Sequence, residues 1–156
     1  MQKLPDFKFT YQDFENYFTS VEAFENGRSF YIDISGKDHI IEADTYEEYL
    51  AIAQMKLAMQ YETLKIEGIE KLCDFKDGTV HAFRYWEQSP SFGVHTDPVD
   101  VIIEVKQGWK IMEVTGQRYS IYEGCVLSIP ANTPHQALNE KEGLMFSYGL
   151  YDTEQH

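Results

Sequence analysis

The sequence predicts a mainly β fold, a small antiparallel barrel or sandwich of the jelly-roll type, with the helices of its N-terminal part packed outside. The first 65 residues contain two segments with apolar residues at helical spacing, whereas the rest divides into short strand-like segments. The 156 residues are 43% hydrophobic and 15% aromatic, which suits one sizeable core. We therefore expect a single domain over 1–156, helical at about 1–65, with a β core at about 66–151.

The N-terminal part is expected to form two helices with a strand between them. Residues 10–24 begin with a threonine that can act as N-cap, and their aromatic residues recur at helical spacing. Residues 44–66 carry the strongest helical pattern, with an apolar residue every three or four positions and Asp44 or Thr45 as N-cap. Between them, residues 29–36 are typical of a short strand.

Beyond residue 66 the apolar pattern changes to that of short strands. Gly, Pro, Asp and Asn separate the segments at close intervals, which favours an antiparallel arrangement. The expected strands are residues 68–73, 79–87, 99–107, 109–114, 119–122, 125–130, 135–139 and 143–151.

Charge and cysteine content limit the classes of function. The net charge of −13 disfavours nucleic acid as a partner, because such a surface repels phosphate backbones. The two cysteines, Cys73 and Cys125, are too few for a disulfide scaffold and are expected to be core or surface thiols. The sequence has no apolar run near the ~20 residues that span a membrane. We expect no membrane association and a cytoplasmic location.

His95 and Asp97 stand at the start of the apolar run 99–107. In an extended segment, residues i and i+2 point to the same side, so the imidazole and the carboxylate can lie side by side. These are two of the three ligands of the facial triad that binds non-haem Fe(II). By itself the tripeptide favours the alternative, an ordinary loop histidine.

A second histidine follows a turn motif further along the chain. Gly124, Pro130, Asn132 and His135 follow the spacing Gly-x5-Pro-x-Asn-x2-His. This arrangement predicts a short strand, a proline-bearing turn and a histidine at the start of the next strand, where it can face the first pair. The alternative is a capping or core histidine.

Lys110 lies in a segment where it shares one face with Met112 and Val114. An ammonium group that points into a barrel is unfavourable unless it meets an anion. Lys110 is therefore a candidate anion-binding residue. The alternative is that the strand twists, or that the side chain extends past Trp109 to solvent.

Together these segments resemble the Jumonji-type (JmjC-like) branch of the cupins, which are Fe(II)- and 2-oxoglutarate-dependent oxygenases. The resemblance covers about 60 residues, 91–150, and rests on the stretches "FGVHTDPVDVIIEVKQGWK", "YEGCVLSIPANTPH" and "LMFSYGL". The family pattern of His-x-Asp, Gly-x-Lys, Gly-x5-Pro-x4-His and a closing strand with a small polar residue is matched here. Cys125 stands where the family often has Asp, and Phe92 where it often has Thr or Ser.

The resemblance implies a role for each matched residue. His95, Asp97 and His135 would hold Fe(II), and Lys110 would bind the distal carboxylate of 2-oxoglutarate. Ser147 and Tyr85 are the candidates to supply further hydroxyl groups to this cosubstrate. The candidate site residues are therefore His95, Asp97, Lys110, His135, Ser147 and Tyr85.

The implied activity is hydroxylation of a protein side chain or a small molecule, coupled to conversion of 2-oxoglutarate to succinate. Two alternatives remain: a metal-binding cupin that does not use 2-oxoglutarate (another dioxygenase, an isomerase or a sensor), and a non-enzymatic binding module. The spacing between Asp97 and Lys110 is similar to that of asparaginyl hydroxylases, which slightly favours a peptide substrate. Many protein hydroxylases of this type have a further C-terminal domain, which we do not expect here. Small barrels of this kind often pair through their edges, so a homodimer is one expected assembly.

Overall fold

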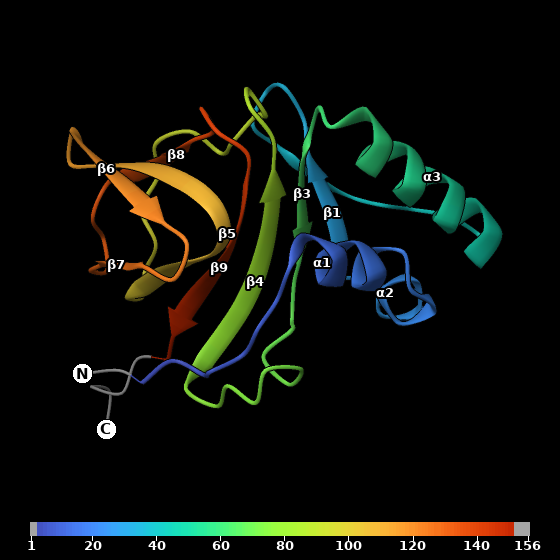
Figure 1. Cartoon of the computed structure of the whole chain (residues 1–156), viewed down its shortest axis with the longest axis horizontal. Coiled ribbons are helices and arrows are strands. Elements are labelled where there is room, and N and C mark those ends of the chain that lie inside the picture. The colour runs from blue at the N-terminus through green and yellow to red at the C-terminus, as the bar shows by residue number, and fades with distance from the viewer. Residues whose placement is uncertain (1–2, 152–156) are drawn as a thin grey trace.

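The structure, a computed structural model, describes residues 3–151 and consists of a curved β sandwich with three short helices from the N-terminal part (Figure 1). The helices are α1 (Tyr11–Phe18), α2 (Val21–Asn26) and α3 (Tyr46–Met59). The strands are β1 (Ser29–Ile32), β2 (Asp38–Ile40), β3 (Thr63–Ile66), β4 (Gly78–Tyr85), β5 (Val101–Val114), β6 (Gln117–Tyr122), β7 (Val126–Ile129), β8 (His135–Leu138) and β9 (Gly143–Leu150).

All strand pairs are antiparallel, and β5 connects the two layers of the sandwich. The strand order is β2-β1-β3-β4-β9-β5-β6, and β7 and β8 also pair with β5. The first half of β5 pairs with β9 and β7, whereas its second half pairs with β6 and β8. The predicted mainly β jelly roll is confirmed.

The structure joins two predicted strands, 99–107 and 109–114, into the single strand β5. Gly108 was expected to separate them, but it lies within the strand at φ +78. The register against β9 shifts between Val105 and Gln107, which marks a β-bulge or irregularity. A bulge bends a strand without ending it. The bend allows β5 to leave one layer and enter the other.

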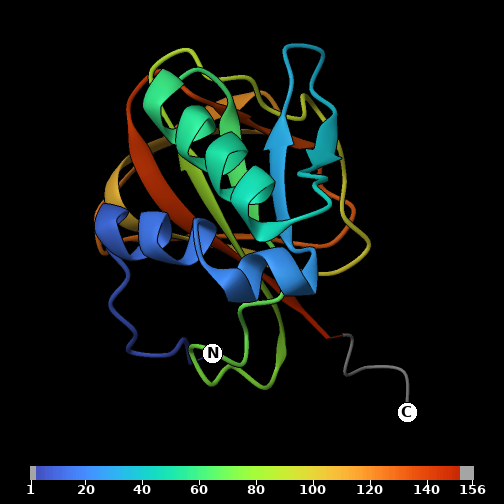
Figure 2. The same ribbon diagram turned by 90° about the vertical axis from the view of Figure 1, so that its right-hand side faces the viewer.

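The three helices cover the outer face of the large sheet, as predicted (Figure 1, Figure 2). Thr10 and Thr45 are the N-caps of α1 and α3. The predicted helix over 10–24 is instead two helices, since Thr19 ends α1 and Ser20 caps α2. A Ser or Thr side chain competes for backbone hydrogen bonds and favours such a break.

Two further predictions at the junction with the β core were wrong. The helix predicted over 44–66 ends at Met59, because Gln60 adopts a left-handed conformation, and its last residues form β3 instead. Residues 68–73 form a turn rather than a strand, in which Cys73 N donates to Ile69 O. The N-terminal 66 residues therefore contribute β1, β2 and β3 to the main sheet as well as the helices.

Both faces of the large sheet are covered. Successive side chains of β9 point to opposite faces of the sheet. Leu144, Phe146 and Tyr148 pack in the cluster beneath the helices. Met145 points the other way and belongs to a second cluster between the two sheets. The next residue on the inner face is Ser147. The inner face therefore combines a small apolar core with an open, partly polar region, which is the site described below.

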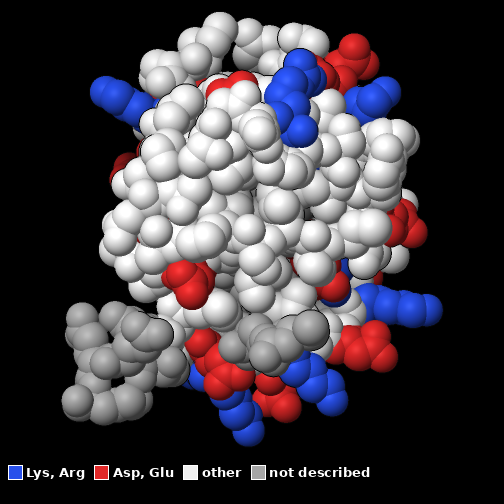
Figure 3. Space-filling model, turned by 90° about the vertical axis from the view of Figure 1, so that its left-hand side faces the viewer, with Lys and Arg blue, Asp and Glu red and all other residues white. Residues whose placement is uncertain are grey.

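Charge is distributed unevenly over the surface. On the face shown in Figure 3, uncharged side chains fill the centre, and most charged groups lie towards its edge. No helix among residues 3–151 is long and apolar enough to cross a membrane. Cys73 is buried and Cys125 is exposed, and both are free, as the sequence predicted.

Candidate metal centre

The structure brings His95, Asp97 and His135 together, although they are up to 40 positions apart in the sequence. One ligand atom from each lies within 4.8 Å of the other two. Asp97 Oδ2 is 3.1 Å from His135 Nε2 and 3.9 Å from His95 Nε2. His135 is buried and the other two are partly exposed, so the group is accessible from one side.

Backbone hydrogen bonds fix the relative positions of the three residues. His95 and His135 form an isolated antiparallel bridge, with both N–H···O distances at 2.9 Å. The bridge places the two imidazole centroids 4.4 Å apart. Asn132 N donates to Asp97 O at 2.7 Å, which ties the turn before His135 to the carboxylate segment. Asn132 has φ +63, the left-handed conformation that glycine and asparagine adopt most readily.

The donor set suits a divalent transition metal. His95 Nδ1 lies 2.8 Å from Gly93 O, and His135 Nδ1 lies 2.8 Å from Thr133 O. Because a carbonyl oxygen only accepts, each Nδ1 donates to its carbonyl, which leaves Nε2 on the Asp97 side as the ring atom that a metal can bind. Two such imidazoles and one carboxylate form the facial set typical of non-haem iron, and backbone carbonyls commonly orient metal-binding histidines.

Lys110 is buried on the same side of the barrel, as the sequence predicted. Its exposed fraction is 2%, and its Nζ donates to Asn139 Oδ1 at 2.5 Å. The ammonium also lies 3.8 Å from the ring centroid of Tyr85. Burial lowers the pKa of Lys110 to about 7. Among residues 3–151 no carboxylate pairs with this lysine, so an incoming anion would stabilise its charged form.

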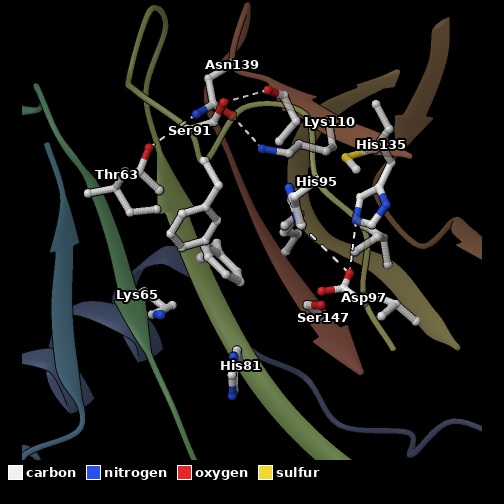
Figure 4. A pocket seen from close by; sticks show the side chains of 18 residues that line it. Thr63, Lys65, His81, Ser91, His95, Asp97, Lys110, His135, Asn139 and Ser147 are labelled. Carbon is white, nitrogen blue, oxygen red and sulfur yellow. Dashed lines mark hydrogen bonds and ion pairs between the residues drawn. The ribbon is translucent and has the colours of Figure 1, made fainter. Parts of the chain in front are cut away.

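A cavity of about 300 Å³ joins the triad to Lys110 (Figure 4). Its floor is the inner face of β3, β4, β9 and the first half of β5. The facing wall carries Lys110 and the two imidazoles, with Asp97 beside them (Figure 4). The three predicted metal ligands and the predicted anion-binding lysine thus share one pocket.

The structure places the two predicted hydroxyl donors, Tyr85 and Ser147, at different positions relative to the cavity. The Tyr85 hydroxyl donates to Trp109 O at 2.7 Å, and Tyr85 does not line the cavity. Ser147 lines the cavity, but on β9 it is four residues from Gly143, which pairs with Gly108 next to the Lys110 end. At ~3.3 Å per residue this is about 13 Å along the strand. The structure brings neither hydroxyl to the Lys110 ammonium.

Sequence reasoning missed Asn139, which connects Lys110 to the pocket wall. Its Nδ2 donates to Ser89 O at 3.0 Å and to Thr63 Oγ1 at 3.2 Å. The sequence predicts Asn139 only as the last residue of a strand, and it predicts Thr63 as part of a helix. Ser91 also lines the cavity, but its hydroxyl donates to Ala137 O at 2.8 Å.

His81 and Lys65 also line the cavity without having been predicted. His81 could have been identified from the sequence, because it shares one face of β4 with Phe83 and Tyr85. A polar residue on an otherwise apolar face indicates a site, and the same argument identified Lys110. Lys65 could not be identified in this way, since its segment was expected to be helical.

Comparison with known proteins supports the fold and leaves the family open. No protein-family model and no curated protein matches the chain. The chain is similar to YcfD, a ribosomal oxygenase from Escherichia coli, in structures with cobalt and succinic acid and with cobalt and 2-oxoglutarate. For both, the TM-score is 0.65 at 14% sequence identity, covering 94% of this chain and 45% of YcfD. The chain thus spans less than half the length of YcfD.

Smaller proteins also match over parts of the chain. A cupin superfamily protein from Desulfitobacterium hafniense has a TM-score of 0.45 at 18% identity, covering 49% of this chain and 70% of its own. A conserved protein of unknown function from Streptococcus pyogenes has a TM-score of 0.48 at 19% identity, covering 56% and 73%. The strand topology and the YcfD match together define a jelly-roll fold, and the chain's own residues His95, Asp97 and His135 form its candidate metal site.

Proposed function

We propose that the chain is an Fe(II)- and 2-oxoglutarate-dependent oxygenase of the Jumonji type. One observation carries the proposal: a two-histidine, one-carboxylate group and a buried, carboxylate-free lysine line the same cavity. A metal site alone fits many cupins. The lysine adds a site for an anion in the same cavity, and a metal-chelating dicarboxylate fits that combination.

The fold similarity is consistent with this assignment. YcfD, which shares the fold over 94% of this chain, is an oxygenase and binds cobalt together with 2-oxoglutarate. At 14% identity the match supports the architecture, so the functional argument rests on the residues of this chain.

In the proposed enzyme, each residue has a defined part. His95, Asp97 and His135 hold Fe(II), which supplies the oxygen-activating chemistry when bound. Lys110 donates a charge-assisted hydrogen bond to the distal carboxylate of 2-oxoglutarate, which orients the keto-acid end towards the triad. Asn139 holds the ammonium in position through the 2.5 Å hydrogen bond. Lys110 is only 2% exposed, so a carboxylate that contacts it is shielded from solvent at that end of the cavity, which strengthens the contact.

A second candidate is a metal-binding cupin that does not use 2-oxoglutarate. The hydrogen bond from Lys110 to Asn139 favours it, because the lysine already has an acceptor without any ligand. In that case Lys110 would stabilise the pocket wall through its contacts with Asn139 and Tyr85. Its removal would then affect stability but not the binding of a dicarboxylate.

We propose a protein side chain or a small molecule as the hydroxylated substrate. The acidic composition argues against nucleic acid. The cytoplasmic location and a homodimer are further proposals.

Binding of 2-oxoglutarate to metal-loaded protein tests the proposed function. Isothermal titration with Ni(II)-loaded protein, in which Ni(II) replaces Fe(II) without turnover, should show one 2-oxoglutarate per chain, and metal-free protein should show none. Binding that is equal with and without metal would contradict the proposal.

A further inference from the structure

We propose that His81 and Ser147 form a substrate subsite at the end of the cavity opposite Lys110, which recognises an uncharged hydrogen-bonding group such as a carboxamide or a hydroxyl. The inference rests on the proposed function, because it names the chemical class of the substrate that the proposed oxygenase hydroxylates. It concerns a separate part of the cavity and can be tested independently.

The pairing of β4 with β9 arranges the residues of the cavity floor in three successive pairs. Tyr85 pairs with Gly143, Phe83 with Met145, and His81 with Ser147. These pairs follow one another on the inner face. The Tyr85 pair lies beneath Lys110, the Phe83 pair forms an apolar middle, and the His81 pair forms a second polar end about 13 Å from the first.

The side chains of His81 and Ser147 have unused hydrogen-bonding capacity. Both line the cavity, and neither forms a side-chain hydrogen bond with any other residue of the described range 3–151. Side-chain groups that face a cavity and have no partner within the protein are available to pair with a ligand. By contrast, the hydroxyls of Thr63, Ser91 and Tyr85 all donate to backbone carbonyls.

This second polar end is suitably placed for a substrate. Ser147 lies beside Asp97 in Figure 4, with His81 further along the same floor. Phe92 contacts His95 with ring centroids 6.1 Å apart, and Phe83 lies edge-on to Phe92 at 6.2 Å. An apolar wall therefore leads from the metal site to the second end, which is where an apolar carbon carrying the reacting C–H bond can rest.

The charges around the second end favour an uncharged ligand group. Lys65, which pairs with Phe83 in the middle of the floor, lines the cavity next to this end, but its ammonium is already paired with Asp38 at 2.6 Å and Glu67 at 2.8 Å. The two carboxylates offset the lysine and repel an incoming carboxylate. They are in turn engaged by the lysine, so they offer little to a substrate ammonium.

The environment of the His81 imidazole favours its uncharged form. Burial lowers the pKa of His81 below its ordinary value, and the nearby Lys65 acts in the same direction, although Glu67, Glu70 and Asp38 oppose them. A neutral imidazole has one donor and one acceptor, and the serine hydroxyl has both functions. A carboxamide or a hydroxyl, which also combines donor and acceptor, complements this pair.

The experiment compares four probes that share a branched four-carbon apolar body: isovaleramide, 3-methylbutan-1-ol, isovalerate and 3-methylbutan-1-amine. Binding to Ni(II)-loaded protein at pH 7.5 is followed by NMR of the uniformly ¹⁵N-labelled imidazoles, once without and once with saturating 2-oxoglutarate. The amide and the alcohol should bind at least about fivefold more tightly than the carboxylate and the amine, and should shift the His81 resonances.

Variants test the two residues individually. His81→Phe and Ser147→Ala should each weaken amide binding about fivefold, and His81→Gln should restore most of it because the amide side chain keeps a donor and an acceptor. Full Ni(II) content in each variant shows that the fold and triad are intact. Lys106→Met serves as the matched control, because Lys106 pairs with Glu104 outside the cavity, and it should leave amide binding unchanged.

The outcomes separate this proposal from the proposed function. Tighter binding of the carboxylate or the amine, no binding of any probe, or amide binding that is insensitive to His81→Phe would each overturn the subsite. Failure of 2-oxoglutarate to bind, with selective amide binding retained, would overturn the oxygenase assignment and leave the subsite as part of another metal-dependent cupin.

Discussion

Replacing Lys110 by methionine separates the role of its charge from the role of its volume. Methionine retains an unbranched chain in a site where the lysine is only 2% exposed, but it carries no charge and no donor. Asn139 Oδ1 then loses its donor at 2.5 Å, a loss of about 1–3 kcal/mol. Removal of a buried ammonium with a lowered pKa acts in the opposite direction. Without ligand, the variant should therefore have a stability close to that of the unmodified protein.

The effect on 2-oxoglutarate should be much larger. A charge-assisted hydrogen bond to a buried carboxylate contributes roughly 1.5–3 kcal/mol, which corresponds to about 10- to 150-fold in dissociation constant. Isothermal titration of Ni(II)-loaded protein measures this, with metal content as the check on the triad. Lys106→Met is the matched control, because Lys106 lies on the same strand and pairs with Glu104 at 3.1 Å, outside the cavity.

An unchanged dissociation constant in Lys110→Met would refute the reasoning. It would show that Lys110 supports the pocket wall through Asn139 and Tyr85, and it would favour a cupin without 2-oxoglutarate.

Three further predictions follow from the same geometry. His95→Ala and Asp97→Ala should each lose stoichiometric Fe(II), Ni(II) or Mn(II) while the circular dichroism spectrum is retained; full metal occupancy in either would exclude that residue as a ligand. Because burial lowers the pKa of Lys110 to about 7, the free protein loses this charge above that pH, and affinity for 2-oxoglutarate should fall up to about tenfold per pH unit between roughly pH 7 and 9. This dependence of affinity on pH should be absent in Lys110→Met. An equal dependence in the variant and the unmodified protein would assign it to another titrating group. Gly143→Ala should reduce the free energy of unfolding by about 1–3 kcal/mol in urea denaturation, because its methyl group would overlap Trp109 O and the Tyr85 hydroxyl; an unchanged midpoint would show that β9 can shift.

The parts of the fold that sequence could predict were those set by local patterns. Alternation identified β4 and β9, and threonine caps identified the starts of α1 and α3. Patterns that depend on tertiary contacts were read incorrectly. Gly108 resembles a turn residue, yet pairing with β9 on both sides of the bulge keeps β5 continuous. The helical pattern of 44–66 extends past Met59, yet pairing with β1 and β4 makes 63–66 a strand.

The same distinction applies to the site. His95, Asp97, Lys110 and His135 could be found because their spacing matches a known arrangement, and the structure brings them to one cavity. Asn139 carries no such spacing, since its role depends on a contact with a residue 29 positions away. The Tyr85 hydroxyl was assigned to ligand binding, but strand pairing turns it to Trp109 O, a contact that only the folded chain reveals.

The most direct test of the central claim is turnover of 2-oxoglutarate by the Fe(II)-loaded protein under oxygen. Succinate is measured with and without a panel of neutral amides, basic peptides and free amino acids. We predict succinate formation that requires Fe(II), is abolished in Asp97→Ala and rises when a substrate of the right class is present. Absence of succinate, together with no binding of 2-oxoglutarate to fully metal-loaded protein, would contradict the assignment of this chain as a 2-oxoglutarate-dependent oxygenase.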